Sequence, residues 1–232
     1  EDAVSDPVIP LPPRWMLPVT GGGGFPVRRV YCVGRNYADH AAEMGHDPNR
    51  EPPFFFQKNP ENLRTDGLFP YPAGSRDVQH EIELMVGMAE GGHDIPTARA
   101  LGCVWGYGVA LDMTARDLQA QAKARGRPWI DAKAFDDAAP CSALTPVDQC
   151  GDYAEGAIEL AVNGELRQRG NLSQQIWSLP EVIAALSARF TLAAGDIILT
   201  GTPAGVAPVI PGDRLVGHIE AMGSVDVTVT CG

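Results

Sequence analysis

Basic residues are scarce in this chain, and it has no long apolar runs. Its 232 residues include 18 Lys and Arg against 29 Asp and Glu, a formal net charge of −11. Nucleic acids and anionic membrane surfaces are bound through clustered cations, so this balance argues against both as partners. A membrane-spanning helix needs about 20 consecutive apolar residues, and no stretch of the sequence comes near that length.

Cysteine pairs are lacking as well. The five cysteines are irregularly spaced, and none forms a Cys-x-x-Cys pair. An odd number at irregular spacing is not a disulfide framework, which favours a reducing compartment. The first residues carry neither the basic nor the apolar part of a signal peptide. We therefore expect a cytoplasmic protein.

Hydrophobic residues make up 44% of the chain, which is enough for one sizeable core. Residues 1–28 are rich in proline and contain four consecutive glycines, which predicts an extended arm with a small strand or two. Residues 29–232 are predicted to form one domain in which strands do not alternate regularly with helices. This favours an α+β, mainly β fold with mixed, largely antiparallel sheets. Capping-box patterns at Thr114-x-x-Asp117 and Ser178-x-x-Glu181 predict two helix starts.

Three carboxylates form the most informative pattern. In a strand beginning at Glu81, alternate side chains share a face, so Glu81 and Glu83 point the same way. Two like charges that close repel each other unless a cation lies between them, and a hard divalent cation would resolve the conflict. Asp112 follows a buried strand and is placed to join them. Because no Cys/His cluster offers zinc ligands, Mg²⁺ or Mn²⁺ is favoured. A solvated strand face is the alternative.

A second pattern concerns a possible general base. His40 and Glu43 lie three residues apart in a helix predicted over residues 37–44, so they share one face. A carboxylate beside an imidazole fixes its tautomer and raises its basicity. The glycine- and proline-rich loop 45–53 that follows is a plausible lid over a site. The alternative is an ordinary solvated helix face.

Six stretches of the sequence, in matching order from about residue 30 to the C-terminus, resemble the fumarylacetoacetate hydrolase family. They are Cys32-Val-Gly-Arg-Asn-Tyr-Ala-Asp-His40, Phe55-Phe-Gln-Lys58, His80-Glu-Ile-Glu-Leu84, Gly106-Tyr to Leu111-Asp-Met-Thr-Ala-Arg-Asp-Leu-Gln119, Trp129 to Lys133, and Leu199-Thr-Gly-Thr-Pro-Ala-Gly-Val206. The resemblance implies a catalytic domain over residues 29–232 with a mixed β-roll fold, usually a homodimer. It implies one Mg²⁺ or Mn²⁺ per subunit, held by the residues that match the family's ligands, Glu81, Glu83 and Asp112.

The resemblance also implies roles for other residues. Lys133 is expected near the metal, and His40 with Glu43 in a lid that closes over the substrate. The run Lys133-Ala-Phe-Asp136, followed by Ala139-Pro140, is most similar to family members that hydrolyse fumarylpyruvate in the gentisate pathway of aromatic catabolism, although Asp137 and Ala138 stand where a histidine and a serine are expected. The residues expected to contact the small diketo-acid substrate are Arg35, Lys58, Arg116, Gln119 and Thr202.

The expected reaction is metal-dependent hydrolysis of a carbon–carbon bond in a diketo acid. Polarisation of the substrate carbonyl by the metal, proton abstraction from water by His40 and Glu43, and stabilisation of a pyruvate enolate by Lys133 would together cleave fumarylpyruvate to fumarate and pyruvate. The same site could hydrolyse other acylpyruvates or decarboxylate oxaloacetate. A metal-binding scaffold without turnover is a third possibility.

Overall fold

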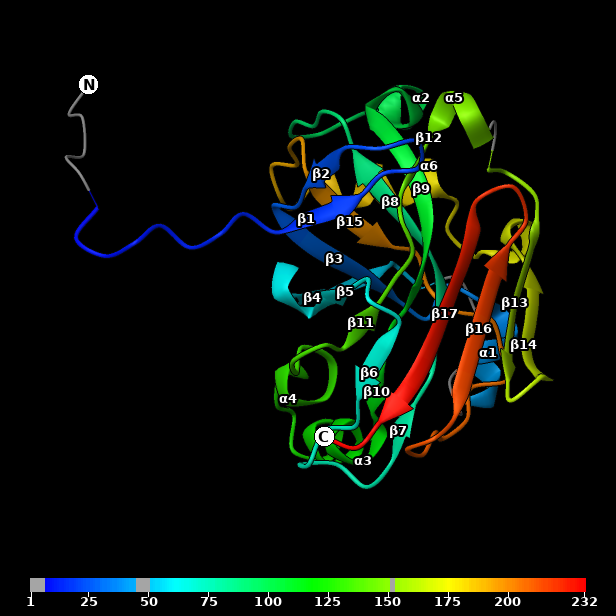
Figure 1. The fold of residues 1–232 in the computed structure, drawn as a ribbon. Coiled ribbons are helices and arrows are strands. Elements are labelled where there is room, and N and C mark those ends of the chain that lie inside the picture. Colours follow the sequence, from blue (N-terminus) through cyan, green and yellow to red (C-terminus); the bar gives the residue numbers. More distant parts are fainter. Residues whose placement is uncertain (1–6, 45–50, 151–152) are drawn as a thin grey trace.

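The structure, a computed structural model, describes residues 7–44, 51–150 and 153–232. Its main sheet has six strands in the order β12 (Thr145–Pro146), β9 (Val104–Leu111), β8 (Ile82–Met88), β15 (Asp196–Leu199), β3 (Arg29–Gly34) and β4 (Phe54–Lys58). A second sheet has five strands in the order β14 (Glu165–Asn171), β13 (Ala157–Val162), β16 (Arg214–Ile219), β17 (Gly223–Thr230) and β6 (Leu68–Pro70). Figure 1 shows the two sheets side by side.

Most strand pairs in these two sheets are antiparallel. Only β15 with β3 and β17 with β6 run parallel. The short pairs outside them are β1 (Met16–Pro18) with β2 (Gly24–Pro26), β5 (Leu63–Arg64) with β11 (Ala139–Pro140), and β7 (Val78–Gln79) with β10 (Thr114–Ala115). The helices are α1 (Ala38–Glu43), α2 (Thr97–Ala100), α3 (Arg116–Ala124), α4 (Ile130–Lys133), α5 (Val147–Cys150) and α6 (Leu179–Ser187). The predicted α+β, mainly β fold is confirmed.

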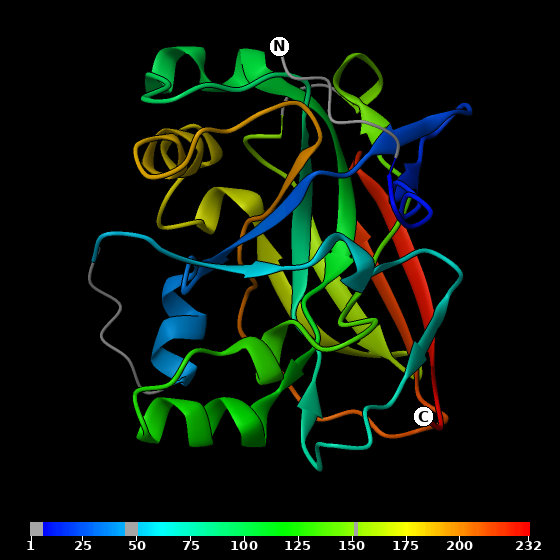
Figure 2. The same ribbon diagram turned by 90° about the vertical axis from the view of Figure 1, so that its left-hand side faces the viewer.

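Side-chain alternation along β8 separates the core from the site. Ile82, Leu84 and Val86 are fully buried in the main hydrophobic core. Met85 points to the opposite side, into a smaller apolar cluster. Glu83 shares the side of Met85, because successive side chains of a strand point to opposite faces. Figure 2 shows α1, α3 and α4 together in the lower half of the molecule, where β8 begins.

The first described residues form an extended arm and a short hairpin. β1 and β2 pair as an antiparallel hairpin whose turn contains Gly21, Gly22 and Gly23. Leu17 and Phe25 anchor this hairpin in the smaller apolar cluster. Residues 7–14 extend away from the body of the molecule (Figure 1), and Val8, Ile9 and Leu11 are largely exposed there.

Of the two predicted capping boxes, one is confirmed and one is wrong. Ser178 and Glu181 form the reciprocal capping hydrogen bonds at the start of α6. Thr114 instead lies in β10, where pairing with β7 holds it extended, and its hydroxyl donates to the Asp112 carbonyl. The Asp117 carboxylate accepts hydrogen bonds from Ser75 and the Arg76 amide, so it serves a neighbouring loop.

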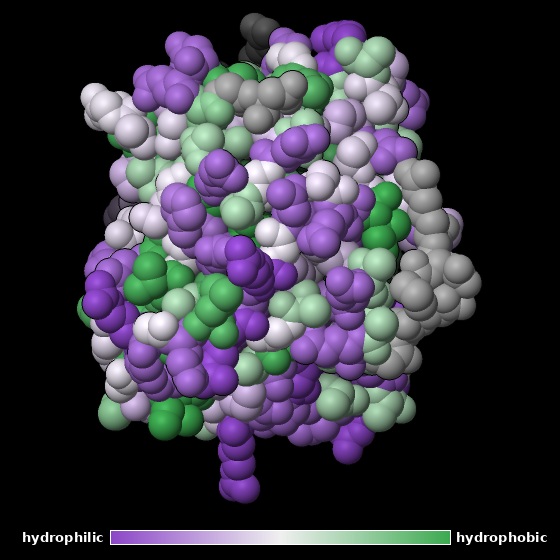
Figure 3. Space-filling view, turned by 90° about the vertical axis from the view of Figure 1, so that its right-hand side faces the viewer, coloured by the Kyte–Doolittle hydropathy of each residue, from purple (hydrophilic) through white to green (hydrophobic). Residues whose placement is uncertain are grey.

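The outer face of the five-stranded sheet is largely polar. Along β16 the side chains of Arg214, Val216 and His218 are exposed, and the alternate ones are buried. Figure 3, which looks onto this side, shows hydrophilic side chains over much of the face, with apolar ones scattered among them. The sequence did not predict β14 at the edge of this sheet, because Gln168 is its only fully buried side chain. No helix among the described residues exceeds nine residues, too short to cross a membrane.

The capping box of α6 gives a stability prediction. Helix α6 packs Val182, Ile183 and Leu186 into the core, so fraying of its first turn weakens that packing. Ser178→Ala should lower the free energy of unfolding by about 1 kcal/mol in urea denaturation, the usual value of an N-cap. The exposed Ser224→Ala in β17 is the control and should change it by less than about 0.5 kcal/mol. Equal effects of the two substitutions would contradict a stabilising cap.

Candidate metal and substrate site

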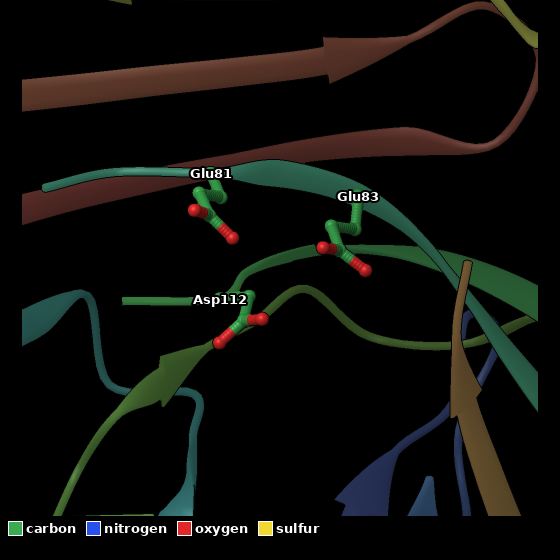
Figure 4. Close-up of side chains that lie close together, drawn as sticks. All are labelled: Glu81, Glu83 and Asp112. Carbon is green, nitrogen blue, oxygen red and sulfur yellow. The ribbon is translucent and has the colours of Figure 1, made fainter. Parts of the chain in front are cut away.

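Three carboxylates meet where β8 begins and β9 ends. The two strands are antiparallel, with Ile82 opposite Leu111, and the Asp112 amide donates to the Glu81 carbonyl at 2.8 Å. This register places Asp112 beside Glu81, and strand alternation brings Glu83 to the same side. One oxygen from each carboxylate lies within 4.8 Å of the others, and all three residues are buried. Figure 4 shows the three side chains close together, Glu81 and Glu83 on one segment and Asp112 on the neighbouring one.

Two cationic side chains, Lys133 and Arg116, form ion pairs with this cluster. Lys133 Nζ lies 2.7 Å from Glu81 Oε2 and 2.7 Å from Asp112 Oδ2. Arg116 donates to Glu81 Oε1 at 2.5 Å. Burial alone would raise the pKa of Glu81, but Lys133 and Arg116 outweigh it and hold that pKa well below its usual range. Burial opposes the charge of Lys133, yet Asp112 and Glu81 raise the pKa of this lysine above its ordinary value.

Glu83 lacks such a partner. Its Oε2 accepts a hydrogen bond from the Gly201 amide at 2.7 Å, and no ion pair joins it to a cation among the described residues. Burial raises the pKa of Glu83 well above its usual range, and the neighbouring charges of Asp112 and Glu81 raise it further. The charged form of Glu83 is therefore disfavoured unless a further cation lies beside it.

Lys58 is a third cationic side chain in contact with the cluster. Its side chain is fully buried, with Nζ 2.8 Å from Asp112 Oδ1. It also donates to the backbone carbonyls of Met113, Lys133 and Ala138. Lys58 therefore fixes Asp112 and the end of α4, and it does not line the pocket above the carboxylates.

The donor set fits a hard divalent cation. Asp112 Oδ1 is buried and accepts no hydrogen bond of good geometry, although Lys58 is close to it. Glu83 has a carboxylate without a cationic partner in the described chain. Carboxylate oxygens are the ligands that Mg²⁺ and Mn²⁺ prefer. Glu81, Glu83 and Asp112 are therefore the residues that could hold such an ion.

His40 reaches the same pocket from α1. Its Nδ1 lies 3.3 Å from Glu43 Oε2, and the Glu43 carboxylate accepts the Gly205 amide at 3.1 Å. Burial lowers the pKa of His40 below its ordinary value, even though Glu81 and Glu43 act to raise it. The imidazole is therefore neutral near pH 7, as a general base must be. The rest of the predicted lid lies partly outside the described residues, because 45–50 are not among them.

The turn 200–205 contacts both the carboxylate cluster and Glu43 of α1. Its amides at Gly201 and Gly205 bind Glu83 and Glu43. Gly205 has φ +99°, and a Cβ there would lie 2.1 Å from the Arg167 carbonyl oxygen, so only glycine fits. Between these glycines, the Thr202 hydroxyl accepts a hydrogen bond from Gln168 at 2.7 Å.

Gln168 is a site residue that sequence reasoning missed. It is fully buried, and its amide nitrogen donates to Thr202 and to the Pro203 carbonyl. Its oxygen lies 2.8 Å from His80 Nδ1 and accepts the Ile82 amide at 3.1 Å. Gln168 thus ties the turn 200–205 to the start of β8. The signal available in the sequence was one polar residue between charged neighbours, which is not specific.

Most of the residues predicted to bind metal or substrate, or to act in catalysis, line one pocket beside the three carboxylates. Of the predicted set, these line it: Arg35, His40, Glu81, Glu83, Asp112, Arg116, Gln119, Lys133 and Thr202. Arg116 also donates to Gln119 Oε1 at 2.9 Å and to Gln79, so each of its three guanidinium nitrogens donates to a protein side chain. Glu43 and Lys58 do not line the pocket and act through neighbours.

The pocket wall also includes residues that the sequence did not single out. Phe54, Phe56 and Trp129 form an aromatic group, with Trp129 edge-on to Phe54 at 5.6 Å between ring centroids. Lys123 of α3 lies with its Nζ 5.2 Å from the centroid of Trp129. The alternation of β4 gives a partial signal, because Phe54 and Phe56 must share one face.

Comparison with known proteins places this architecture. The fumarylacetoacetate (FAA) hydrolase C-terminal family model matches residues 29–230. The crystal structure of fumarylpyruvate hydrolase from Pseudomonas aeruginosa, in complex with Mn²⁺ and pyruvate, is 45% identical and superposes with a TM-score of 0.95. The match covers 98% of this chain and 100% of that one.

Two curated relatives have other activities in their names. The mitochondrial oxaloacetate decarboxylase of Dictyostelium discoideum is 42% identical over 187 residues, covering 80% of this chain and 85% of the relative. The mitochondrial oxaloacetate tautomerase FAHD1 of Homo sapiens is 41% identical over 202 residues, covering 87% and 91%. With a family model over residues 29–230 and relatives above 40% identity across most of both chains, the resemblance seen in the motifs is confirmed: the chain belongs to the fumarylacetoacetate hydrolase family.

Proposed function

We propose that this protein hydrolyses fumarylpyruvate to fumarate and pyruvate, using one Mg²⁺ or Mn²⁺ held by Glu81, Glu83 and Asp112. One observation carries the proposal: a neutral histidine and a partly uncompensated carboxylate cluster line the same pocket. A metal site alone would suit many enzymes or a scaffold. A base that faces it suits a reaction in which water is activated. The similarity to the fumarylpyruvate hydrolase structure supports this choice.

The residues divide the work as follows. When bound, the divalent ion supplies Lewis-acid polarisation to the 2-oxo-carboxylate end of the substrate. His40, oriented by Glu43, takes a proton from water. The water oxygen then bonds to the acyl carbonyl carbon, and the adjacent carbon–carbon bond breaks. The bond's electron pair leaves with the pyruvate fragment as an enolate, which takes up a proton to become pyruvate.

The leaving enolate needs a fixed positive charge nearby. Lys133 is buried, and its ammonium group is held between two carboxylates at 2.7 Å. A cation held in this way stabilises developing negative charge without reorganising, and its effect is large where water is excluded. Gln119 and Thr202 border the same pocket with polar groups and are retained as candidate substrate contacts.

Two of the cationic side chains predicted to bind the substrate, Lys58 and Arg116, instead bind other groups of the protein. Lys58 is buried and occupied by Asp112 and three carbonyls, so we assign it to positioning Asp112. Arg116 is occupied by Glu81, Gln79 and Gln119, so we assign it to orienting Glu81. Of the arginines predicted from the sequence, Arg35 remains available for the substrate.

Oxaloacetate is the second candidate substrate. The relatives named for oxaloacetate decarboxylase and oxaloacetate tautomerase activity favour it. Neither reaction adds water across a carbon–carbon bond, so neither needs the base in the role given above. The homodimer and the cytoplasmic location stay predictions. The pathway, gentisate catabolism, is likewise part of the proposal.

Metal binding should be visible without turnover. Adding Mg²⁺ or Mn²⁺ to metal-stripped protein should raise the melting temperature, because the ion binds the folded cluster and relieves repulsion among its carboxylates. Glu83→Gln should remove most of this shift in thermal unfolding. His40→Ala is the matched control and should keep it. EDTA should abolish turnover, and full activity in excess EDTA with no metal found by elemental analysis would refute the site.

The base assignment predicts a pH profile. His40 must be neutral to act, and its pKa lies below 6.5 because of burial. Turnover should therefore stay constant down to about pH 6.5 and fall only below it. Glu43→Gln removes a charge that raises this pKa, so the acid limb should move to still lower pH. His40→Ala and Glu43→Gln should each reduce kcat by about two to four orders of magnitude. Near-native kcat in both variants would leave α1 without a catalytic role.

The substrate is tested with a panel under identical Mg²⁺. A charge-assisted contact to the second carboxylate should favour fumarylpyruvate over acetylpyruvate by about tenfold to a hundredfold in kcat/KM. Oxaloacetate should be turned over more slowly than fumarylpyruvate. Equal specificity constants for fumarylpyruvate and acetylpyruvate would indicate a general acylpyruvate hydrolase, and a preference for oxaloacetate would favour the second candidate.

A further inference from the structure

The chain has only three lysines, and all of them lie at this site. Lys58 and Lys133 are buried and bind the carboxylate cluster. The third, Lys123, is exposed on α3 and lines the same pocket. In a chain with 15 arginines this placement singles out Lys123, the one lysine without a role in holding the carboxylates.

Charge pairing leaves two cations of the pocket available. Arg116 and Lys133 are bound to the carboxylate cluster. Arg35 and Lys123 have no hydrogen bond or ion pair to an acidic side chain within the described ranges 7–44, 51–150 and 153–232. The pocket therefore carries two cationic side chains that are not bound to its carboxylate cluster.

Both available cations border the aromatic wall. The Arg35 guanidinium lies 5.3 Å from the centroid of Phe54, and Lys123 Nζ lies 5.2 Å from that of Trp129. Phe54 and Trp129 are themselves in edge contact. Arg35 reaches this position with a backbone φ of +56°, which is uncommon for a residue other than glycine and is often found at functional sites.

Two aromatic rings separate Lys123 from the lysine at the carboxylate cluster. Lys133 Nζ lies 5.0 Å from the ring of Phe56, and Phe56 lies 5.9 Å from Trp129. Lys123 lies on the next ring, Trp129. The pocket thus has Lys133 and the candidate metal site at one end, Lys123 at the other, and aromatic rings between them. This suits a ligand with two anionic ends and an unsaturated chain.

We propose that Lys123, together with Arg35, binds the distal carboxylate of the substrate, with Phe54 and Trp129 against its unsaturated chain. This rests on the proposed function and assigns the end of the substrate that lies away from the metal. Partial burial and the charges of Arg116 and Arg35 lower the pKa of Lys123, so a bound carboxylate relieves repulsion among these cations.

The kinetic test uses Lys123→Met, which keeps the side-chain length and removes the charge. The ratio of kcat/KM for fumarylpyruvate to that for acetylpyruvate should fall about tenfold or more, mainly through KM, as expected for a charge-assisted contact to a non-reacting group. Lys123→Arg should recover part of the ratio. Arg125→Met removes a cation from the same end of α3 but outside this pocket, and it should leave the ratio unchanged.

A binding test separates this inference from the proposed reaction. Fumarate and crotonate share a four-carbon chain and differ by one carboxylate. Calorimetry on the full chain with Mn²⁺ should show that Lys123→Met weakens fumarate binding about tenfold and leaves crotonate unchanged. If the wild type does not cleave fumarylpyruvate, the proposed function fails, and the fumarate titration still decides the role of Lys123. Unchanged fumarate affinity and an unchanged kinetic ratio in Lys123→Met would overturn the role of Lys123.

Discussion

The site depends on the mutual repulsion of three carboxylates placed together inside the protein. At an effective dielectric constant of 20, two unit charges 4 Å apart interact by about 4 kcal/mol, a large part of the stability of a typical domain. Antiparallel pairing of β8 with β9 forces the three groups together. Lys58, Lys133 and Arg116 compensate Glu81 and Asp112 from two sides. Glu83 is left without a cationic partner, and a divalent ion held by the three carboxylates would compensate it.

The turn 200–205 links side chains that lie far apart in the sequence. Its amides bind Glu83 from the carboxylate cluster and Glu43 from α1, which are 118 and 162 residues from their partners. Gln168 joins the same turn to the start of β8. A shift of this turn would therefore move Glu43 together with the carboxylates. The glycines that allow such close approach shape this pocket although they have no side chains.

The sequence predicted the groups that follow local rules. Strand alternation placed Glu81 and Glu83, and the end of an apolar strand placed Asp112. It could not predict the role of Lys58, whose partners lie 54 to 80 residues away in the chain. It also missed β14, because the outward-facing side chains of this edge strand are polar. The Thr114 capping box failed for a related reason: tertiary pairing with β7 overrides a local helix signal.

The distribution of side-chain amines has a practical consequence. Two of the three lysines are almost fully shielded from solvent, and the third stands in the pocket wall. The rest of the surface obtains its positive charge from arginine, which does not react with amine-directed reagents under mild conditions. Acylating labels, cross-linkers and lysine-based immobilisation will therefore modify Lys123 before any other side-chain amine. Amine-directed labelling of this chain therefore modifies the wall of the pocket beside the three carboxylates.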